Sequence, residues 1–226
     1  MQISLKSTER DAFIVHLLFV ILCAGILLLP IPLLIGPRLF ILVVAYNILI
    51  PAIGYWRGHK DWLYLWVFVA LISLLMIFPD WFLVTPLGTL VFLPDGFPQI
   101  GPVSGYMALL WAIPLFIIIF LGLRIIERRS KPLAYGIVAL TSFLIFTAAE
   151  ASLTFVWHAQ NVTMIASVAL YILLPEIILG LSAFWGYQSI QDKSHWWKPV
   201  AAFLIMLLYI GSACFFYLLI EIIILG

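Results

Sequence analysis

Long apolar runs fill this sequence, and they constrain its fold more than any other feature. Hydrophobic residues make up 65% of the 226 positions and charged residues only 9%, whereas an average soluble domain has about 25% charged residues. A helix needs about 20 apolar residues to cross a bilayer. The sequence therefore predicts an all-α integral membrane protein, in which residues 1–226 form a single transmembrane domain.

Seven segments are apolar and long enough to span the bilayer. They cover approximately residues 12–34, 39–56, 61–79, 104–125, 133–157, 162–188 and 198–225. Short polar or Gly- and Pro-containing turns separate them, so we expect consecutive helices to pack as antiparallel neighbours. The prediction is a multi-pass protein with seven transmembrane helices, located in the cell membrane if the organism is prokaryotic.

Basic residues indicate the orientation of the chain, because cytoplasmic loops of membrane proteins are enriched in Lys and Arg. If successive loops alternate between the two sides, ten of the eleven Lys and Arg residues fall on one side and only Arg38 on the other. The N-terminus is then predicted inside and, after an odd number of spans, the C-terminus outside. The net charge of +1 argues against a nucleic-acid partner.

Residues 79–103, between the third and fourth segments, are apolar but contain five Pro and three Gly. Pro removes a backbone donor and Gly weakens a helix, so this stretch cannot form a regular spanning helix. Irregular backbone at membrane depth is tolerated where it is buried in protein or lines a cavity. We expect a re-entrant or interfacial loop on the outer side, with an ordinary loop on the lipid headgroups as the alternative.

Carboxyl groups within or beside the apolar segments are the main functional signal. An ionisable group costs about 2.5 kcal/mol or more at the bilayer centre, so such residues are functional candidates. Five acids share this setting, in the predicted outer half or midplane: Asp80, Asp95, Glu150, Glu176 and Glu221. Burial without a cation favours the protonated form of a carboxyl group, which can then act as a general acid.

A structural role is the alternative for each acid. Glu221 lies near a helix end and can reach the interface, and Asp95 in Pro-Asp-Gly is a typical turn residue. Asp80 can be solvated at a helix end, whereas Glu150 and Glu176 can bond to a neighbouring helix. Glu150 is expected in the outer half of the fifth segment and Glu176 near the middle of the sixth. We retain Asp80, Glu150 and Glu176 as candidate catalytic acids.

Polar and aromatic residues at the same depth are candidates for substrate binding. Thr147, Glu150 and Thr154 share one helix face, since their spacings are three and four. Aromatic faces stabilise positive charge, although Trp81 and Trp157 are also typical of interfacial anchors. The candidate substrate-binding residues are Tyr46, Asn47, Trp81, Asp95, Tyr106, Trp111, Thr147 and Tyr171.

Motifs for metal, retinal or diphosphate chemistry are missing from the sequence. No two of the four histidines can be placed at one level in the middle of the membrane, and no lysine lies in mid-span to form a Schiff base. No Gly-rich phosphate loop or paired aspartate motif occurs. We therefore expect neither a metal nor a cofactor, and acid chemistry on an apolar molecule is the reaction class that remains.

The stretch 79–114 resembles the signature region of the heterodimeric-type and fungal-type lycopene cyclases. The similar positions are Asp80-Trp81, Gly88 with Phe92, Ile100-Gly101-Pro102-Val103 and Tyr106. Ser104-Gly105 stands where that family has paired glutamates. The resemblance implies a related membrane fold for isoprenoid chemistry, shared in kind with the small membrane-bound terpene cyclases. It also implies that Asp80 is the position that transfers, while the acid is supplied from elsewhere in the chain.

These observations lead to the hypothesis of an isoprenoid or terpenoid cyclase-like enzyme of the isomerase or lyase class. A protonated carboxylic acid would start carbocation cyclisation of an apolar polyene or its epoxide. Two alternatives stay open, namely a proton-coupled carrier that uses Glu150 and Glu176 as a relay, and a non-catalytic lipid-binding subunit. The expected partners are an apolar isoprenoid and membrane lipids, and both a monomer and a homo-oligomer are compatible with the sequence.

Overall fold

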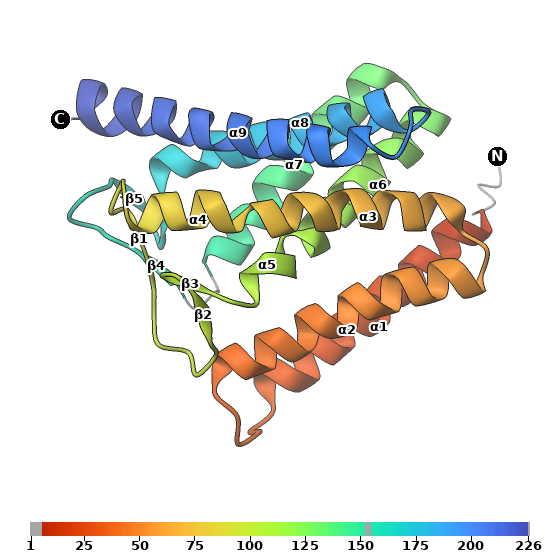
Figure 1. Ribbon diagram of the computed structural model, residues 1–226, viewed down its shortest axis with the longest axis horizontal. Coiled ribbons are helices and arrows are strands. Elements are labelled where there is room, and N and C mark those ends of the chain that lie inside the picture. Colours follow the sequence, from red (N-terminus) through yellow and green to blue (C-terminus); the bar gives the residue numbers. More distant parts are fainter. Residues whose placement is uncertain (1–5, 152–154, 226) are drawn as a thin grey trace.

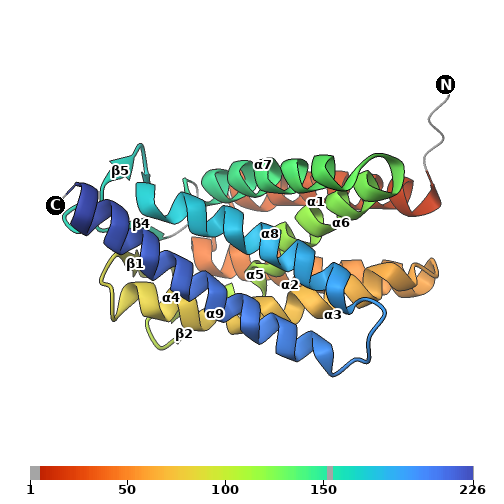
Figure 2. The same cartoon turned by 90° about the horizontal axis from the view of Figure 1, so that it is seen from above.

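The computed structural model describes residues 6–151 and 155–225 of the chain. Long helices lie side by side along one direction, and short β-strands gather at one end of them (Figures 1 and 2). Within the described ranges, seven helical segments are long and apolar enough to cross a membrane. This confirms the all-α fold class with seven candidate spans, and it supports a multi-pass integral membrane protein.

Several of the spans consist of two consecutive helical elements. The first three spans are α1 (Ser7–Leu28), α2 (Ile35–Trp56), and α3 (Lys60–Leu75) with α4 (Ile77–Val84). The fourth and fifth are α5 (Met107–Leu110) with α6 (Ala112–Arg128), and α7 (Lys131–Glu150). The last two are η1 (Leu170–Ile172) with α8 (Leu173–Ile190), and α9 (Trp197–Tyr217) with the π-helix η2 (Leu218–Ile224). Helices α6 to α9 pack in sequence order, and α9 also packs against α3.

Two loops meet at one end of the helices (Figure 1). Strand β1 (Leu90–Phe92) of the first loop pairs antiparallel with β4 (Phe155–Trp157) of the second. Each loop also forms a small hairpin, β2 (Gln99–Ile100) with β3 (Val103–Ser104), and β5 (Met164–Ile165) with β6 (Val168–Ala169). These pairings satisfy backbone groups of largely apolar loops. We call residues 85–106 and 155–169 together the loop cap.

The predicted helix boundaries are wrong around this loop cap. The third span continues past Pro79 to Val84, so the irregular segment begins later than predicted. Pro79 falls in the first turn of α4, where a missing N–H is tolerated, and the interruption at Met76 precedes it. The fifth helix ends at Glu150 rather than at 157, because residues 155–157 pair as a strand. The sixth span begins at Leu170 rather than at 162.

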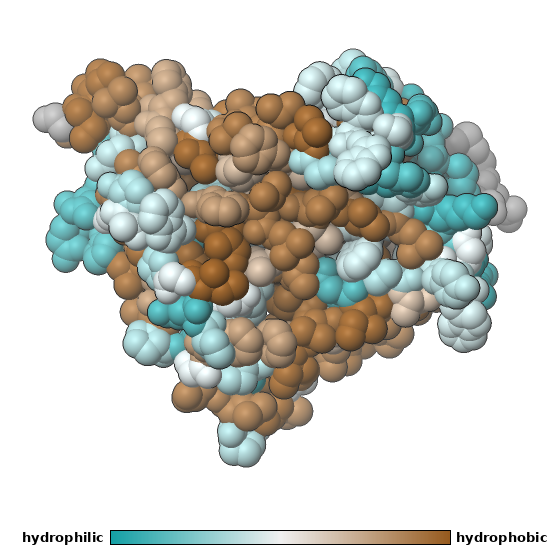
Figure 3. All heavy atoms as spheres, in the orientation of Figure 1, coloured by the Kyte–Doolittle hydropathy of each residue, from teal (hydrophilic) through white to brown (hydrophobic). Residues whose placement is uncertain are grey.

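Side-chain polarity divides the molecule as expected for a membrane protein. Apolar side chains cover the middle of the helices, and hydrophilic ones gather toward their ends (Figure 3). The end opposite the loop cap carries several ion pairs, including Lys6 with Glu127 at 2.7 Å and Arg57 with Asp11 at 2.8 Å. The predicted basic side is therefore one physical end of the helices, although the inside–outside orientation stays a prediction.

Asp95 connects the loop cap to the start of α2 through hydrogen bonds. Its carboxyl group accepts hydrogen bonds from the Phe97 amide at 2.9 Å and the Ser104 hydroxyl at 2.7 Å. Its carbonyl oxygen accepts one from the Gly36 amide at 2.9 Å. A Cβ atom at position 36 would lie 2.6 Å from the Asp95 carboxyl carbon, so only glycine fits there without displacement. These contacts are those of a structural turn residue.

Replacing Asp95 with Ala should destabilise the protein by about 1–3 kcal/mol, because the buried Ser104 hydroxyl and the partly buried Phe97 amide lose their acceptor. Chemical unfolding of the detergent-solubilised protein measures this change. Asp192→Ala is the control, since Asp192 is exposed in the connection between α8 and α9. Equal unfolding free energies for the two variants would show that the Asp95 contacts contribute nothing to stability.

Candidate functional site

Three helices bring the candidate catalytic acids to the capped end of the molecule. Asp80 lies in α4, Glu150 is the last residue of α7, and Glu176 lies in the first turn of α8. Their exposed fractions are 2%, 9% and 0%, respectively. The Glu150 carboxyl group interacts electrostatically with both Glu176 and Asp80. These three residues form one group, which we call the acid cluster.

Indole N–H groups, rather than cations, stabilise the acid cluster. Trp157 Nε1 donates to Glu150 Oε2 at 2.7 Å, and Trp111 Nε1 donates to Asp80 Oδ2 at 3.3 Å. In the described part of the chain, no N–H or hydroxyl group donates to Glu176, and its carboxyl group lies next to that of Glu150. Within that part, no ion pair includes these three acids. Two adjacent carboxyl groups without a cation repel when both are charged, which favours a shared proton.

Aromatic side chains enclose the acid cluster on the side of α9 and the loop cap. Tyr209, in the middle of α9, is close enough to sense the charge of all three acids, and its ring centre lies 6.1 Å from that of Trp111. Tyr171 packs edge-on against Trp157, with ring centres 5.8 Å apart. The Tyr171 hydroxyl shares a 2.8 Å hydrogen bond with Thr89. The acids therefore lie among aromatic rings and neutral hydrogen-bonding groups.

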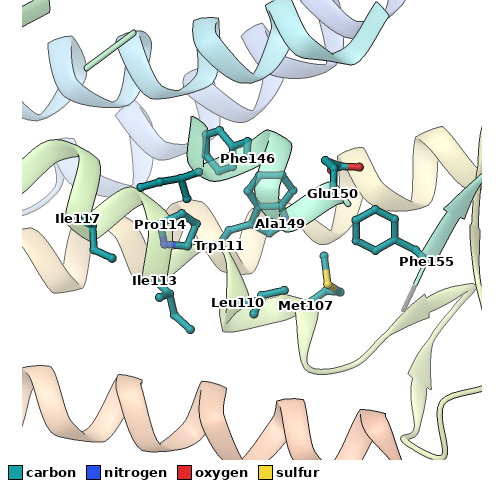
Figure 4. Close-up of a pocket in the computed structure, with 11 residues that line it drawn as sticks. Met107, Leu110, Trp111, Ile113, Pro114, Ile117, Phe146, Ala149, Glu150 and Phe155 are labelled. Atoms are coloured by element: carbon teal, nitrogen blue, oxygen red, sulfur yellow. The ribbon is translucent and has the colours of Figure 1, made fainter. Parts of the chain in front are cut away.

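An apolar pocket of about 220 Å³ borders the acid cluster between α5, α6 and α7 (Figure 4). Trp111 and Phe146 lie on its walls, and Phe155 of β4 lies beside them. Ile113 and Ile117 of α6 are half-buried at its rim. Among the described residues that line this pocket, Glu150 is the one charged group. A glutamate thus lines an otherwise apolar space.

Tyr46 and Asn47 of α2 form hydrogen bonds with residues of neighbouring helices. The Tyr46 hydroxyl and His16 Nε2 form a 3.0 Å hydrogen bond. The Asn47 side chain donates to the Leu109 carbonyl at 3.2 Å and accepts from Trp66 Nε1 at 3.1 Å. Neither residue lines the pocket beside Glu150. Asn47 instead links α2 to α3 and to α5, and α5 forms part of the pocket wall.

The remaining candidates for substrate binding occupy different environments. Trp81 is 44% exposed and lines a shallow apolar hollow between α4 and α9. Tyr106 is buried, and its ring packs against Phe97 of the loop cap at 6.0 Å. Thr147 lies about one turn before the end of α7, and its buried hydroxyl has no hydrogen-bond partner in the described part of the chain. Thr154 lies outside the described residues.

Glu176 lies elsewhere than its sequence position suggested, whereas Glu221 lies near the end of the last span as expected. Glu176 lies in the first turn of α8, not in mid-helix, because the β5–β6 hairpin delays the start of the span. Pro175 falls in that same first turn, where its missing N–H breaks no helix bond. Glu221 Oε2 accepts hydrogen bonds from the amide and hydroxyl groups of Thr163, both at 2.8 Å. Glu221 therefore ties the loop cap to η2.

Two residues of the site were not selected from the sequence. Trp157 was interpreted as an interfacial anchor, but it is buried and donates to Glu150. Tyr209 was not selected, although a tyrosine in the middle of an apolar span needs surroundings for its hydroxyl group. No group of three or more His, Cys, Asp and Glu side chains in residues 6–151 and 155–225 is arranged to hold a metal ion.

The fold and the site define a class, namely a helical multi-pass membrane protein with a buried acid cluster beside an apolar pocket. Residues 77–220, more than half of the chain, match the family described as "Domain of unknown function (DUF6989)", and the chain belongs to this family. The matched range includes the acid cluster, the loop cap and the pocket, and it leaves out α1, α2 and α3. No curated protein and no solved structure matches the chain.

Proposed function

We propose that this protein is a membrane-embedded isoprenoid or terpenoid cyclase-like enzyme in which Glu150 is the proton donor. One observation carries the proposal: Glu150 lines an apolar pocket, and its carboxyl group lies next to a second buried carboxyl group, that of Glu176. A neutral carboxylic acid in contact with a hydrocarbon is the arrangement needed to protonate an alkene.

The proposed reaction conserves the atoms of the substrate. The Glu150 O–H proton is transferred to an alkene carbon, or to the oxygen of an epoxide, and the carboxylate keeps the electron pair of the broken O–H bond. The resulting carbocation is attacked by a second alkene of the same molecule, which closes a carbon–carbon bond. Loss of a proton to a carboxylate then ends the reaction. The Trp157 N–H, 2.7 Å from Glu150 Oε2, stabilises the carboxylate formed in the first step.

The pocket walls suit a cationic intermediate. The faces of Trp111, Phe146 and Phe155 can stabilise positive charge, and an apolar lining keeps out water that would trap the cation. The volume of about 220 Å³ is below the range of about 300–1,000 Å³ that is common for ligand sites. We therefore expect the pocket to hold the reacting end of a longer molecule, whose remainder lies past Ile113 and Ile117.

The other two acids have supporting roles in this proposal. Glu176, next to Glu150 and without a hydrogen-bond donor among the described residues, can share the proton and return it to Glu150 after each turnover. Asp80 accepts from Trp111 and thereby fixes an indole that lines the pocket. Glu150 is thus the proposed catalytic residue, and Asp80 and Glu176 are positioning residues.

Lipid extracts from cells that produce this protein should contain an isoprenoid that is missing when Asp80→Asn, Glu150→Gln and Glu176→Gln are combined. Mass spectrometry of extracts from matched cultures measures this difference, after the amount of protein in the membrane has been equalised. Asp61→Asn combined with Glu127→Gln serves as the control, because both residues lie at the opposite end of the helices. An unchanged isoprenoid profile in the triple variant would overturn the proposal and favour a carrier or a lipid-binding subunit.

A further inference from the structure

A second pocket lies at the end of the helices opposite the acid cluster. It has a volume of about 320 Å³ and lies between the N-terminal parts of α3 and α9. We call it the basic pocket, and its lining residues are Lys60, Leu63, Tyr64, Val67, His195 and Lys198. Two lysines and a histidine thus line one small space at the predicted inner interface.

The positive charge of Lys198 lacks an anionic neighbour. Lys198 is only 7% exposed. Its Nζ atom lies 4.3 Å from the ring centre of Tyr64 and 3.3 Å from His195 Nδ1, and the His195 ring stacks on Tyr64. A buried charge of this kind is normally paired with an opposite charge. Within the described ranges, no ion pair includes Lys60 or Lys198.

The neighbouring acid does not compensate for these lysines. Asp61 follows Lys60 directly in the sequence, but its carboxyl group pairs with Arg124 at 3.3 Å. Arg124 also pairs with Glu127 at 3.0 Å. Both carboxylates are therefore directed to other cations, and the basic pocket keeps its excess positive charge.

The backbone adds to this positive potential. Helices α3 and α9 both begin at the basic pocket, and in the part of the chain that the structure describes neither has a side-chain cap on its first turn. The N-terminus of a helix carries a partial positive charge. The amides of Trp62, Trp197 and Lys198 already donate to turn carbonyls, so the contribution of the two helices is this partial charge. It adds to the charge of the two lysines, and the sum favours a phosphate group.

We propose that the basic pocket binds a phosphate group, with the headgroup of an anionic lipid as its source. The apolar part of the lining favours a lipid over free phosphate. Leu63 and Val67 follow Lys60 along α3 at successive spacings of three and four, so they share one face of the helix beyond the charged end. Val67 is exposed there, and an acyl chain can lie along this face while the phosphate contacts Lys60 and Lys198. This site is separate from the acid cluster and does not depend on the proposed cyclase activity.

Titration of the purified full-length protein with lipids tests this site. The probes are phosphatidylglycerol, phosphatidylcholine and inorganic phosphate, and the readouts are native mass spectrometry and the thermal unfolding temperature. We expect phosphatidylglycerol to bind and to raise the unfolding temperature more than phosphatidylcholine does. Added salt should weaken this difference, because the attraction is electrostatic.

Substitutions of the two lysines, compared with a control variant, test whether the lipid binds at the basic pocket. Lys60→Gln changes an exposed side chain, and Lys198→Met keeps an apolar stem against Tyr64. We expect each to weaken phosphatidylglycerol binding by about fivefold. Lys131→Gln combined with Lys193→Gln is the control, because these lysines lie over Tyr135 and Trp197 and outside the basic pocket. The control removes two positive charges from the same end of the protein, against one in each test variant.

The outcomes separate the sources of the phosphate group. Loss of phosphatidylglycerol binding in Lys60→Gln and Lys198→Met, with normal binding in the control, supports a lipid site. Equal effects of inorganic phosphate and phosphatidylglycerol, both lost in the same variants, would support the phosphate site but overturn the lipid source. The proposal would be overturned if Lys60→Gln bound phosphatidylglycerol as well as the wild type does. It would also be overturned if the wild type bound phosphatidylglycerol and phosphatidylcholine equally. Both tests hold even if Lys198→Met fails to fold.

Discussion

Glu150→Gln should lower product formation by at least about 100-fold, the lower end of what a positioned general acid contributes. Glutamine has nearly the size of glutamate and still offers an oxygen to Trp157 Nε1, so the 2.7 Å contact can be kept. It has no acidic proton to transfer to an alkene. Product per amount of protein in isolated membranes, quantified by mass spectrometry, measures the loss.

Glu127→Gln is the matched control for this substitution. Glu127 pairs with Lys6 and Arg124 at the partly exposed end of the molecule, and such pairs contribute little to stability. We expect the control to retain the activity of the wild type. If Glu150→Gln retained it as well, Glu150 would not be the proton donor, and Asp80 or Glu176 would have to be tested singly.

Gly180→Ala should destabilise the protein by about 1–3 kcal/mol, the usual effect of overfilling a packed interior. Helices α7 and α8 approach closely at this position. A Cβ atom on residue 180 would overlap Ser142 Oγ and lie 2.9 Å from Ser142 Cβ. The Ser142 hydroxyl donates to the Val138 carbonyl at 2.7 Å. This hydrogen bond keeps the hydroxyl at the place that the new methyl group would occupy. Chemical unfolding in detergent measures the loss.

Ser142→Gly in the Gly180→Ala background should restore part of the stability, because it removes the atoms that the new methyl group meets. Gly136→Ala and Gly211→Ala are the controls. In the described structure, a Cβ atom at either position meets nothing within 4 Å, and alanine favours a helix over glycine by about 1 kcal/mol. Equal stabilities of Gly180→Ala and Gly136→Ala would show that the two helices separate without loss.

Hydropathy predicted the number of spans because each apolar run has about the length that a bilayer requires. It could not predict where α7 ends. Residues Phe155–Trp157 are apolar and suit a helix as well as a strand, and their partner strand Leu90–Phe92 lies far away in the sequence. A pairing of that kind leaves no local signal, so the fifth helix was predicted to be too long.

The acid cluster was partly predictable for a similar reason. Sequence position gives the approximate depth of a residue in the membrane, and depth grouped five acids. The turn at Asp95 and the helix end at Glu221 then left Asp80, Glu150 and Glu176 as candidates. Sequence position does not give the direction of a side chain around its helix axis. Tyr46 and Asn47 were therefore selected as substrate-binding candidates, whereas their hydrogen bonds go to His16, Leu109 and Trp66. The direction of each side chain is known only once the packing of the helices is known.

The pairing of β1 with β4 also sets an order for biogenesis. Strand β1 is synthesised before the fourth and fifth spans, and β4 only after them. Contacts between distant parts of a chain form late, because a long segment must first be brought into place. Trp157 belongs to β4, so its hydrogen bond to Glu150 can form only when the fifth span has been inserted. A chain interrupted after the fifth span but before β4 would leave Glu150 in the bilayer without this donor.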